Sequence, residues 1–152
     1  MDGATNWMST SFNPATGLFY LMALEKCNIF SRNSEWWKQG ESFYGGSART
    51  VQGEQPRKYL RALDVQTGRI VWEYEQAGPG ESWAGLLSTA SELVFFGDDN
   101  GAFTAVSAKD GKPLWHYQMN ERWKASPMTY MSNGRQYVAI AASSMVVVFG
   151  LP

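Results

Sequence analysis

The side chains that could do chemistry in this chain are few, and their spacing points to turns instead of a reaction centre. The run Asp98-Asp99-Asn100-Gly101 offers carboxylate and amide oxygens of the kind that bind calcium. An EF-hand calcium loop, however, spaces its acids along a longer segment and ends in a glutamate, and this run has neither feature. A short acidic run that ends in glycine is typical of a hairpin turn. We therefore predict a turn here and no metal site.

The single histidine and the single cysteine also lack chemical partners. His116 follows Trp115 in a predicted strand and has no second His or Cys at ligand spacing, so we interpret it as a half-exposed surface residue. Cys27 is interpreted as a small buried hydrophobe and leaves no intrachain disulfide possible. Asp64 and Asp110 lie in turn sequences, where carboxylates cap backbone amides. We expect no catalytic residue and no metal ligand in this chain.

An internal repeat indicates the elements that would position any functional residue. The stretch Ala62–Trp72 returns 43 residues later as Ala105–Trp115, and both copies predict strand, tight turn and strand, closed by a tryptophan. A period in the forties with one fixed tryptophan is typical of β-propeller blades. One blade cannot bury both faces alone, so we expect Trp72 and Trp115 to be buried where neighbouring blades pack.

Alternation and turn residues predict eleven short strands. A first blade would contain Trp7–Phe12, Leu18–Leu24, Tyr59–Asp64 and Arg69–Glu75, and a second Ala84–Thr89, Leu93–Gly97, Ala102–Ser107 and Lys112–Met119. A third set would contain Ser126–Met131, Arg135–Ala141 and Met145–Gly150, with a hairpin turn at Asn133-Gly134. Residues 25–58 lose this periodicity, so we predict a long loop insertion there.

The predicted fold class is therefore all-β: a partial β-propeller of about two complete four-stranded blades plus three strands of another. Closed propellers have about four to eight blades, so we expect residues 1–152 to be the C-terminal part of a larger ring. The missing fourth strand of the last set would come from the N-terminal part of that ring.

Composition excludes two classes of partner. The chain has 13 Lys and Arg against 14 Asp and Glu, so it carries no basic footprint for nucleic acid. Its longest apolar runs, such as Met145–Phe149, are too short to span a membrane. The first residues lack the charged and apolar regions of a signal peptide. Seven Trp, seven Tyr and eight Phe suit packing between blades.

Three parts of the chain resemble the pyrroloquinoline quinone (PQQ)-dependent methanol and ethanol dehydrogenases. They are Gly3–Met8 with Ser11–Pro14 and Thr16–Tyr20; Ser82–Ala90 with Leu93–Asp98; and Ala125–Tyr130 with Gly134–Ala139. The resemblance covers nearly the whole chain and is weakest over residues 33–56. The chain departs from the family at Ala141–Ser144 and at Ala90–Glu92, where the family tends to carry glycine. The first departure puts the last cofactor contact in doubt.

The resemblance implies a function as well as a fold. It implies part of an eight-bladed periplasmic quinoprotein that oxidises primary alcohols by hydride transfer to PQQ, with Ca²⁺ or a lanthanide as Lewis acid and a cytochrome c-type electron acceptor. Asn6 matches the family asparagine that donates a hydrogen bond near the quinone carbonyls, and Trp83 matches a tryptophan at the cofactor periphery. The base and the metal ligands would lie upstream, so the chain alone is expected to be inactive.

A second class of function stays open. Propellers built from similar repeats, including some outer-membrane assembly lipoproteins, act as protein-binding scaffolds without a cofactor. Asn6-Trp7 and Trp83 separate the two readings, since a scaffold has no need of them. The pair Trp36-Trp37 in the long insertion could cover the mouth of the ring or face a partner, but we expect it to pack on its own blade.

Overall fold

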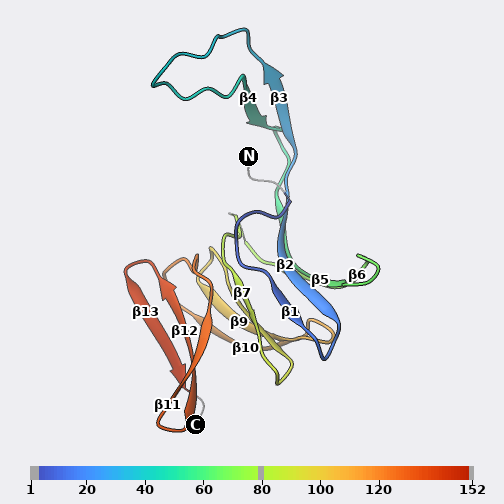
Figure 1. Ribbon diagram of the computed structural model, residues 1–152, viewed down its shortest axis with the longest axis vertical. Helices are drawn as coiled ribbons and strands as arrows, with labels where there is room; N and C mark the ends of the chain where they lie inside the picture. Colours follow the sequence, from blue (N-terminus) through green and yellow to red (C-terminus); the bar gives the residue numbers. More distant parts are fainter. Residues whose placement is uncertain (1–3, 79–80, 151–152) are drawn as a thin grey trace.

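The computed structural model describes residues 4–78 and 81–150, and all of its regular structure is β-strand (Figure 1). The prediction of an all-β chain is confirmed, and no helix that could cross a membrane is found in the described ranges. Gly3, which opens the first segment that carries the family resemblance, lies outside the described residues.

The first sheet has the antiparallel order β1-β2-β5-β6. Its strands are β1 (Ser11–Asn13), β2 (Leu18–Glu25), β5 (Arg57–Asp64) and β6 (Ile70–Gln76). The innermost strand is shorter than predicted. Residues 7–10 of the expected Trp7–Phe12 strand are irregular, although Ala4 still bridges to Leu24.

The second and third sheets follow the predicted strand order. The second has the order β10-β9-β8-β7, with β7 (Leu86–Ser88), β8 (Leu93–Gly97), β9 (Ala102–Ser107) and β10 (Pro113–Gln118). The third contains β11 (Met128–Ser132), β12 (Arg135–Ala142) and β13 (Met145–Gly150), in that order. The turn between β11 and β12 has positive φ at both Asn133 (49°) and Gly134 (77°), as a tight type I′ hairpin requires.

The long insertion contains a hairpin that the sequence did not predict. Strands β3 (Asn28–Arg32) and β4 (Gly46–Thr50) pair with each other, and Figure 1 shows them standing away from the three sheets. We call residues 26–56 the arm. Both strands of the arm are exposed or half-exposed along their lengths. The sequence therefore lacks the alternation of apolar and polar residues that marks a strand with one buried face. Trp36 and Trp37 lie on the arm and are 90% and 63% exposed, so the expectation that they pack on their own blade is wrong.

Two apolar clusters join the sheets. One lies between the first and second sheets and includes Tyr20, Leu60, Val94 and Phe96. The other joins the second and third sheets around Phe103, Trp123, Ile140 and Ala142. The second sheet therefore packs against both neighbours, whereas the first and third sheets each pack against the second alone, as expected for a repeat architecture in which each unit contacts only its neighbours.

The two repeat tryptophans differ in burial. Trp72 is half-buried, donates from its indole nitrogen to the carbonyl oxygen of Ala108 in the turn after β9 (3.1 Å), and packs on Tyr20. Trp115 is 41% exposed, so the prediction of burial fails there. It meets Phe103 of its own sheet and Phe149 of β13 in the third sheet edge-on.

One end of the three sheets carries most of the charged loops. Because consecutive strands are antiparallel, residues 4–8, 76–83, 98–101, 119–126 and 143–144 all lie at the end from which the arm rises. We call this the upper end, and Figure 1 shows it facing the arm. The turns at residues 14–17, 65–68, 89–92 and 108–111 lie at the opposite, lower end.

Candidate functional site

The inner strands of the three sheets meet at one point near the upper end. The hydroxyls of Ser9 and Ser126 are 2.8 Å apart, and the Leu86 amide donates to the Ser9 carbonyl (2.9 Å). A Cβ added at Gly85 would lie 2.0 Å from the Ser126 hydroxyl oxygen and 3.0 Å from the Ser9 Cβ. Only glycine fits between these two serines. We call Ser9, Gly85 and Ser126 the inner junction.

Two tryptophans rise from the inner junction toward the upper end. Trp7 and Trp83 each precede their junction residue by two positions, and their rings stack at 6.2 Å with an angle of 21°. Trp83 is half-buried against the first apolar cluster, whereas Trp7 is 72% exposed. Trp7 lies outside β1, in the irregular segment that precedes it. The pair forms an aromatic surface that is open to solvent.

Asn6 lies beside this aromatic surface. Its side-chain carbonyl accepts a hydrogen bond from the Trp7 backbone amide (2.9 Å), and the residue is exposed. In the described part of the chain its amide nitrogen has no hydrogen-bond acceptor. The donor half of the amide is thus available to a ligand, while the acceptor half fixes the local turn.

Glu81 and Lys26 support Trp83, and the sequence analysis missed both. The Trp83 indole nitrogen donates to one carboxylate oxygen of Glu81 (2.6 Å), and the Lys26 ammonium pairs with the other (3.2 Å). Lys26 comes from the base of the arm and Glu81 from the loop after β6. Because Glu81 occupies the indole N–H, Trp83 would meet a ligand through its ring instead of through a hydrogen bond.

The acidic run at residues 98–101 forms the predicted turn. The Asp98 carboxylate accepts from the backbone amides of Asn100 (2.8 Å) and Ala102 (2.9 Å). In Asp99, one carboxylate oxygen is buried and has no partner in the described part of the chain. Burial raises the pKa of Asp99, and the charges of Lys124, Arg122 and Lys58 oppose that rise.

A polar cleft of about 630 Å³ lies at the upper end of the second and third sheets. The loop after β10, the end of β12 and the turn before β13 line it, with Asn120, Glu121, Arg122, Lys124, Ala125, Ala141 and Ser143. Ala141 and Ser143, two of the residues at which the chain departs from the family, thus line the same cleft as the cations of Arg122 and Lys124.

The remaining chemical candidates stay outside this region. Asp64 accepts from the Thr67 amide (2.8 Å) and Asp110 from the Lys112 amide (3.3 Å), which confirms that both cap turns. Cys27 is exposed, not buried, because it lies where the chain leaves the sheet for the arm, and its hydrogen bond with Glu54 raises the pKa of the thiol. His116 is exposed on β10. In residues 4–78 and 81–150, no three His, Cys, Asp or Glu side chains form a group that could hold a metal ion.

Comparison with known proteins agrees with the resemblance drawn from the sequence. Residues 79–138 match the family described as glucose/ethanol/alcohol dehydrogenase, beta-propeller domain. The quinoprotein ethanol dehydrogenase of Pseudomonas aeruginosa is 34% identical over 145 residues, which are 91% of this chain and 22% of the relative. The chain therefore spans about a fifth of the length of the curated relatives it matches.

Solved structures of quinoprotein dehydrogenases contain a segment of similar fold. The quinohemoprotein alcohol dehydrogenase of Comamonas testosteroni matches with a TM-score of 0.81 and 30% identity, over 92% of this chain and 22% of that one. A europium-containing methanol dehydrogenase matches with a TM-score of 0.77 and 27% identity, over 88% and 24%. BamB from Moraxella catarrhalis has a TM-score of 0.52 at 15% identity, over 97% of this chain and 50% of that one, a likeness of fold alone. The chain shares both sequence and fold with one segment of the quinoprotein alcohol dehydrogenases.

Proposed function

We propose that this chain, as a segment related to the quinoprotein alcohol dehydrogenases, forms part of a propeller that oxidises primary alcohols to aldehydes with PQQ. The observation that carries the proposal is the pairing of Trp7 with Trp83 beside Asn6, at the upper end of adjacent inner strands. A planar aromatic cofactor needs a flat apolar surface and a few fixed polar groups, and this region supplies both.

The residues of the upper end fit PQQ in two ways. The open tryptophan pair suits the edge or face of a fused ring system, and the Asn6 amide can donate to a carbonyl oxygen without giving up a proton. When bound, PQQ supplies the hydride acceptor. Asn6 would orient that acceptor and stabilise negative charge as it develops on the oxygen, while Glu81 and Lys26 hold the Trp83 ring in place.

The other parts of the reaction belong to segments outside this chain. A general base, a Ca²⁺ or lanthanide ion and its ligands would come from the remaining blades of the propeller. A small alcohol would be the substrate, a cytochrome c-type protein would receive the electrons, and the whole protein would be periplasmic. A cofactor-free scaffold is less well supported, because the sequence similarity is to dehydrogenases and the likeness to BamB extends to fold alone.

The test uses the full-length protein that contains this segment. We expect Asn6→Ala to lower kcat on the order of 10²-fold at matched PQQ occupancy, the effect of removing other oxyanion donors. Asn6→Asp should be slower still, since a carboxylate would face the negative charge of the reduced quinone. Asn33→Ala, on the exposed arm, is the matched control and should leave kcat unchanged. Equal rates for the wild type and Asn6→Ala would reduce Asn6 to a turn residue.

The 152-residue chain itself gives a second test. Mixed with PQQ, Ca²⁺, ethanol and an artificial electron acceptor, it should reduce no acceptor above the blank, because the base and metal ligands are expected elsewhere. Alcohol-dependent turnover by this chain would show that the active site has been assigned to the wrong segment.

A further inference from the structure

The residues that precede the inner junction by two positions correspond in the three sheets, and one of these three residues carries a charge. Ser9, Gly85 and Ser126 meet in space, so the residues two positions before them correspond from sheet to sheet. These residues are Trp7, Trp83 and Lys124. At roughly 3.3 Å per extended residue, each begins within about 7 Å of the junction. Where the first two sheets present an indole, the third presents an ammonium group.

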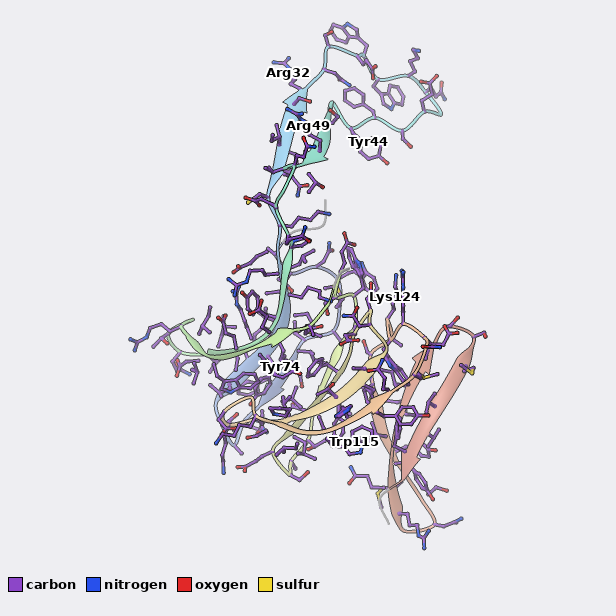
Figure 2. The ribbon with its side chains drawn as sticks, turned by 180° about the vertical axis from the view of Figure 1, so that it is seen from behind. Arg32, Tyr44, Arg49, Tyr74, Trp115 and Lys124 are labelled. Carbon is purple, nitrogen blue, oxygen red and sulfur yellow. The ribbon has the colours of Figure 1, made fainter. Side chains whose placement is uncertain are left out.

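Among the residues that the structure describes, Lys124 has no carboxylate partner, unlike four other lysines. Lys26, Lys38, Lys109 and Lys112 each lie within 4.0 Å of a carboxylate. In residues 4–78 and 81–150, no carboxylate lies that close to the Lys124 ammonium. Lys124 is exposed, and Figure 2 places it at the end of the sheets that faces the arm.

The surroundings of Lys124 favour an anion of limited size. Lys124 and Arg122 line the polar cleft of about 630 Å³, with the Asn120 amide and the Ser143 hydroxyl as further polar groups. Glu121 also lines the cleft, and Asp99 lies near both cations, so the cleft is not uniformly positive. This pattern suits a ligand that places one of its carboxylates at Lys124 and Arg122 and keeps its other charges away from Glu121 and Asp99.

We propose that Lys124 binds a carboxylate of the same planar cofactor whose rings lie at the Trp7–Trp83 pair. This inference rests on the proposed function. It adds Lys124, which precedes the third sheet, to the cofactor-binding residues Trp7 and Trp83, which precede the inner strands of the first and second sheets. The aromatic pair would hold the ring system, and the ammonium would fix its rotation in the plane by a charge-assisted hydrogen bond.

The experiment measures PQQ binding to the metal-free, full-length apoprotein by equilibrium dialysis, without relying on turnover. Lys124→Met removes the charge and keeps the length of the side chain, and we expect it to raise the Kd for PQQ about tenfold, as the loss of one hydrogen bond to a charged group would. Lys124→Arg should stay within about threefold of the wild type. Lys112→Met, at the lower end of the sheets and paired with Asp110, is the matched control and should bind as the wild type does.

Salt dependence gives a second readout. Binding to the wild type should weaken between low and high ionic strength, and Lys124→Met should lose part of that dependence. Circular dichroism and the thermal midpoint of each apoprotein establish that the variants are folded. If the wild type binds PQQ and Lys124→Met binds it equally tightly, or if Lys124→Arg is as weak as Lys124→Met, this inference is wrong while the proposed function stands. If the wild type binds no PQQ, both fail.

Discussion

Gly68 and Gly111 hold the same position in two copies of one turn, and replacing each with alanine separates backbone strain from packing. Their φ angles are 70° and 71°, and their amides donate to the carbonyls of Asp64 (2.8 Å) and Ser107 (2.9 Å). A Cβ at Gly68 would have no neighbour within 4 Å. A Cβ at Gly111 would lie 2.6 Å from Cε3 of Trp72, which packs over the turn.

The expected costs follow from these two environments. Gly68→Ala should cost about 1–2 kcal/mol, the penalty of a left-handed conformation for an L-residue. Gly111→Ala carries the same penalty and an additional clash, because a carbon–carbon contact at 2.6 Å is about 1 Å shorter than the optimum. Overpacking of this kind adds about 1–3 kcal/mol. In a Trp72→Ala background the clash disappears, and the further cost of Gly111→Ala should fall to that of Gly68→Ala.

Hydrogen exchange of the 152-residue chain measures these costs locally. Mass spectrometry of peptides that cover residues 64–69 and 107–112 gives the opening free energy of each turn. A double-mutant cycle between Gly111→Ala and Trp72→Ala should give a coupling of about 1–3 kcal/mol. Equal costs at Gly68 and Gly111, or a Gly111→Ala cost that Trp72→Ala does not relieve, would refute the reasoning that Trp72 packs on this turn.

Three further outcomes are expected. Trp115→Ala should destabilise the chain less than Trp72→Ala, which should cost about 3–5 kcal/mol by urea unfolding, because Trp115 is 41% exposed. Asp99→Asn should raise the thermal midpoint at pH 7. Burial raises the pKa of Asp99 in the folded chain, so the protonated side chain favours folding. The contribution of Asp99 to the stability of the chain is therefore greatest below the ordinary pKa of about 4 and is lost as the pH rises through the pKa of the folded state. The stability advantage of Asp99→Asn should accordingly vanish in acid. The isolated chain should self-associate in analytical ultracentrifugation, since Val146 and Val148 of β13 are 71% and 46% exposed; a concentration-independent monomer would contradict this.

Sequence patterns predicted the second and third sheets well because each is made of consecutive strands. The bounds of β8, β9 and β13 agree with the prediction, and each pairs with a strand that is next to it in the chain. The first sheet was harder to predict from sequence patterns. Its β2–β5 pair encloses the arm, and the arm strands bury little, so no period of two marks them.

The candidate site was only partly predictable. Asn6 and Trp83 came from a family resemblance, and the structure brings them to the same end of adjacent inner strands. Glu81 supports Trp83 through a loop contact that has no pattern in the sequence. Lys124 could have been found by extending the repeat to the third sheet, but a lysine where the other sheets carry tryptophan hides the correspondence. Trp123, which is fully buried and donates to the Gly101 carbonyl, was missed because it lies in an irregular loop.

The arm also affects the order in which the first sheet can form. The β2–β5 ladder ends at the Glu25–Arg57 pair, and pairing resumes at Asn28–Thr50, so the arm and the sheet form one long antiparallel ribbon. Closing β3 on β4 joins ends separated by about 13 residues, whereas closing β2 on β5 directly joins ends separated by about 31, a difference of about 0.8 kcal/mol in chain entropy. The ribbon can therefore zip from its tip toward the sheet. Shortening the arm would change the folding rate of the first sheet more than its stability.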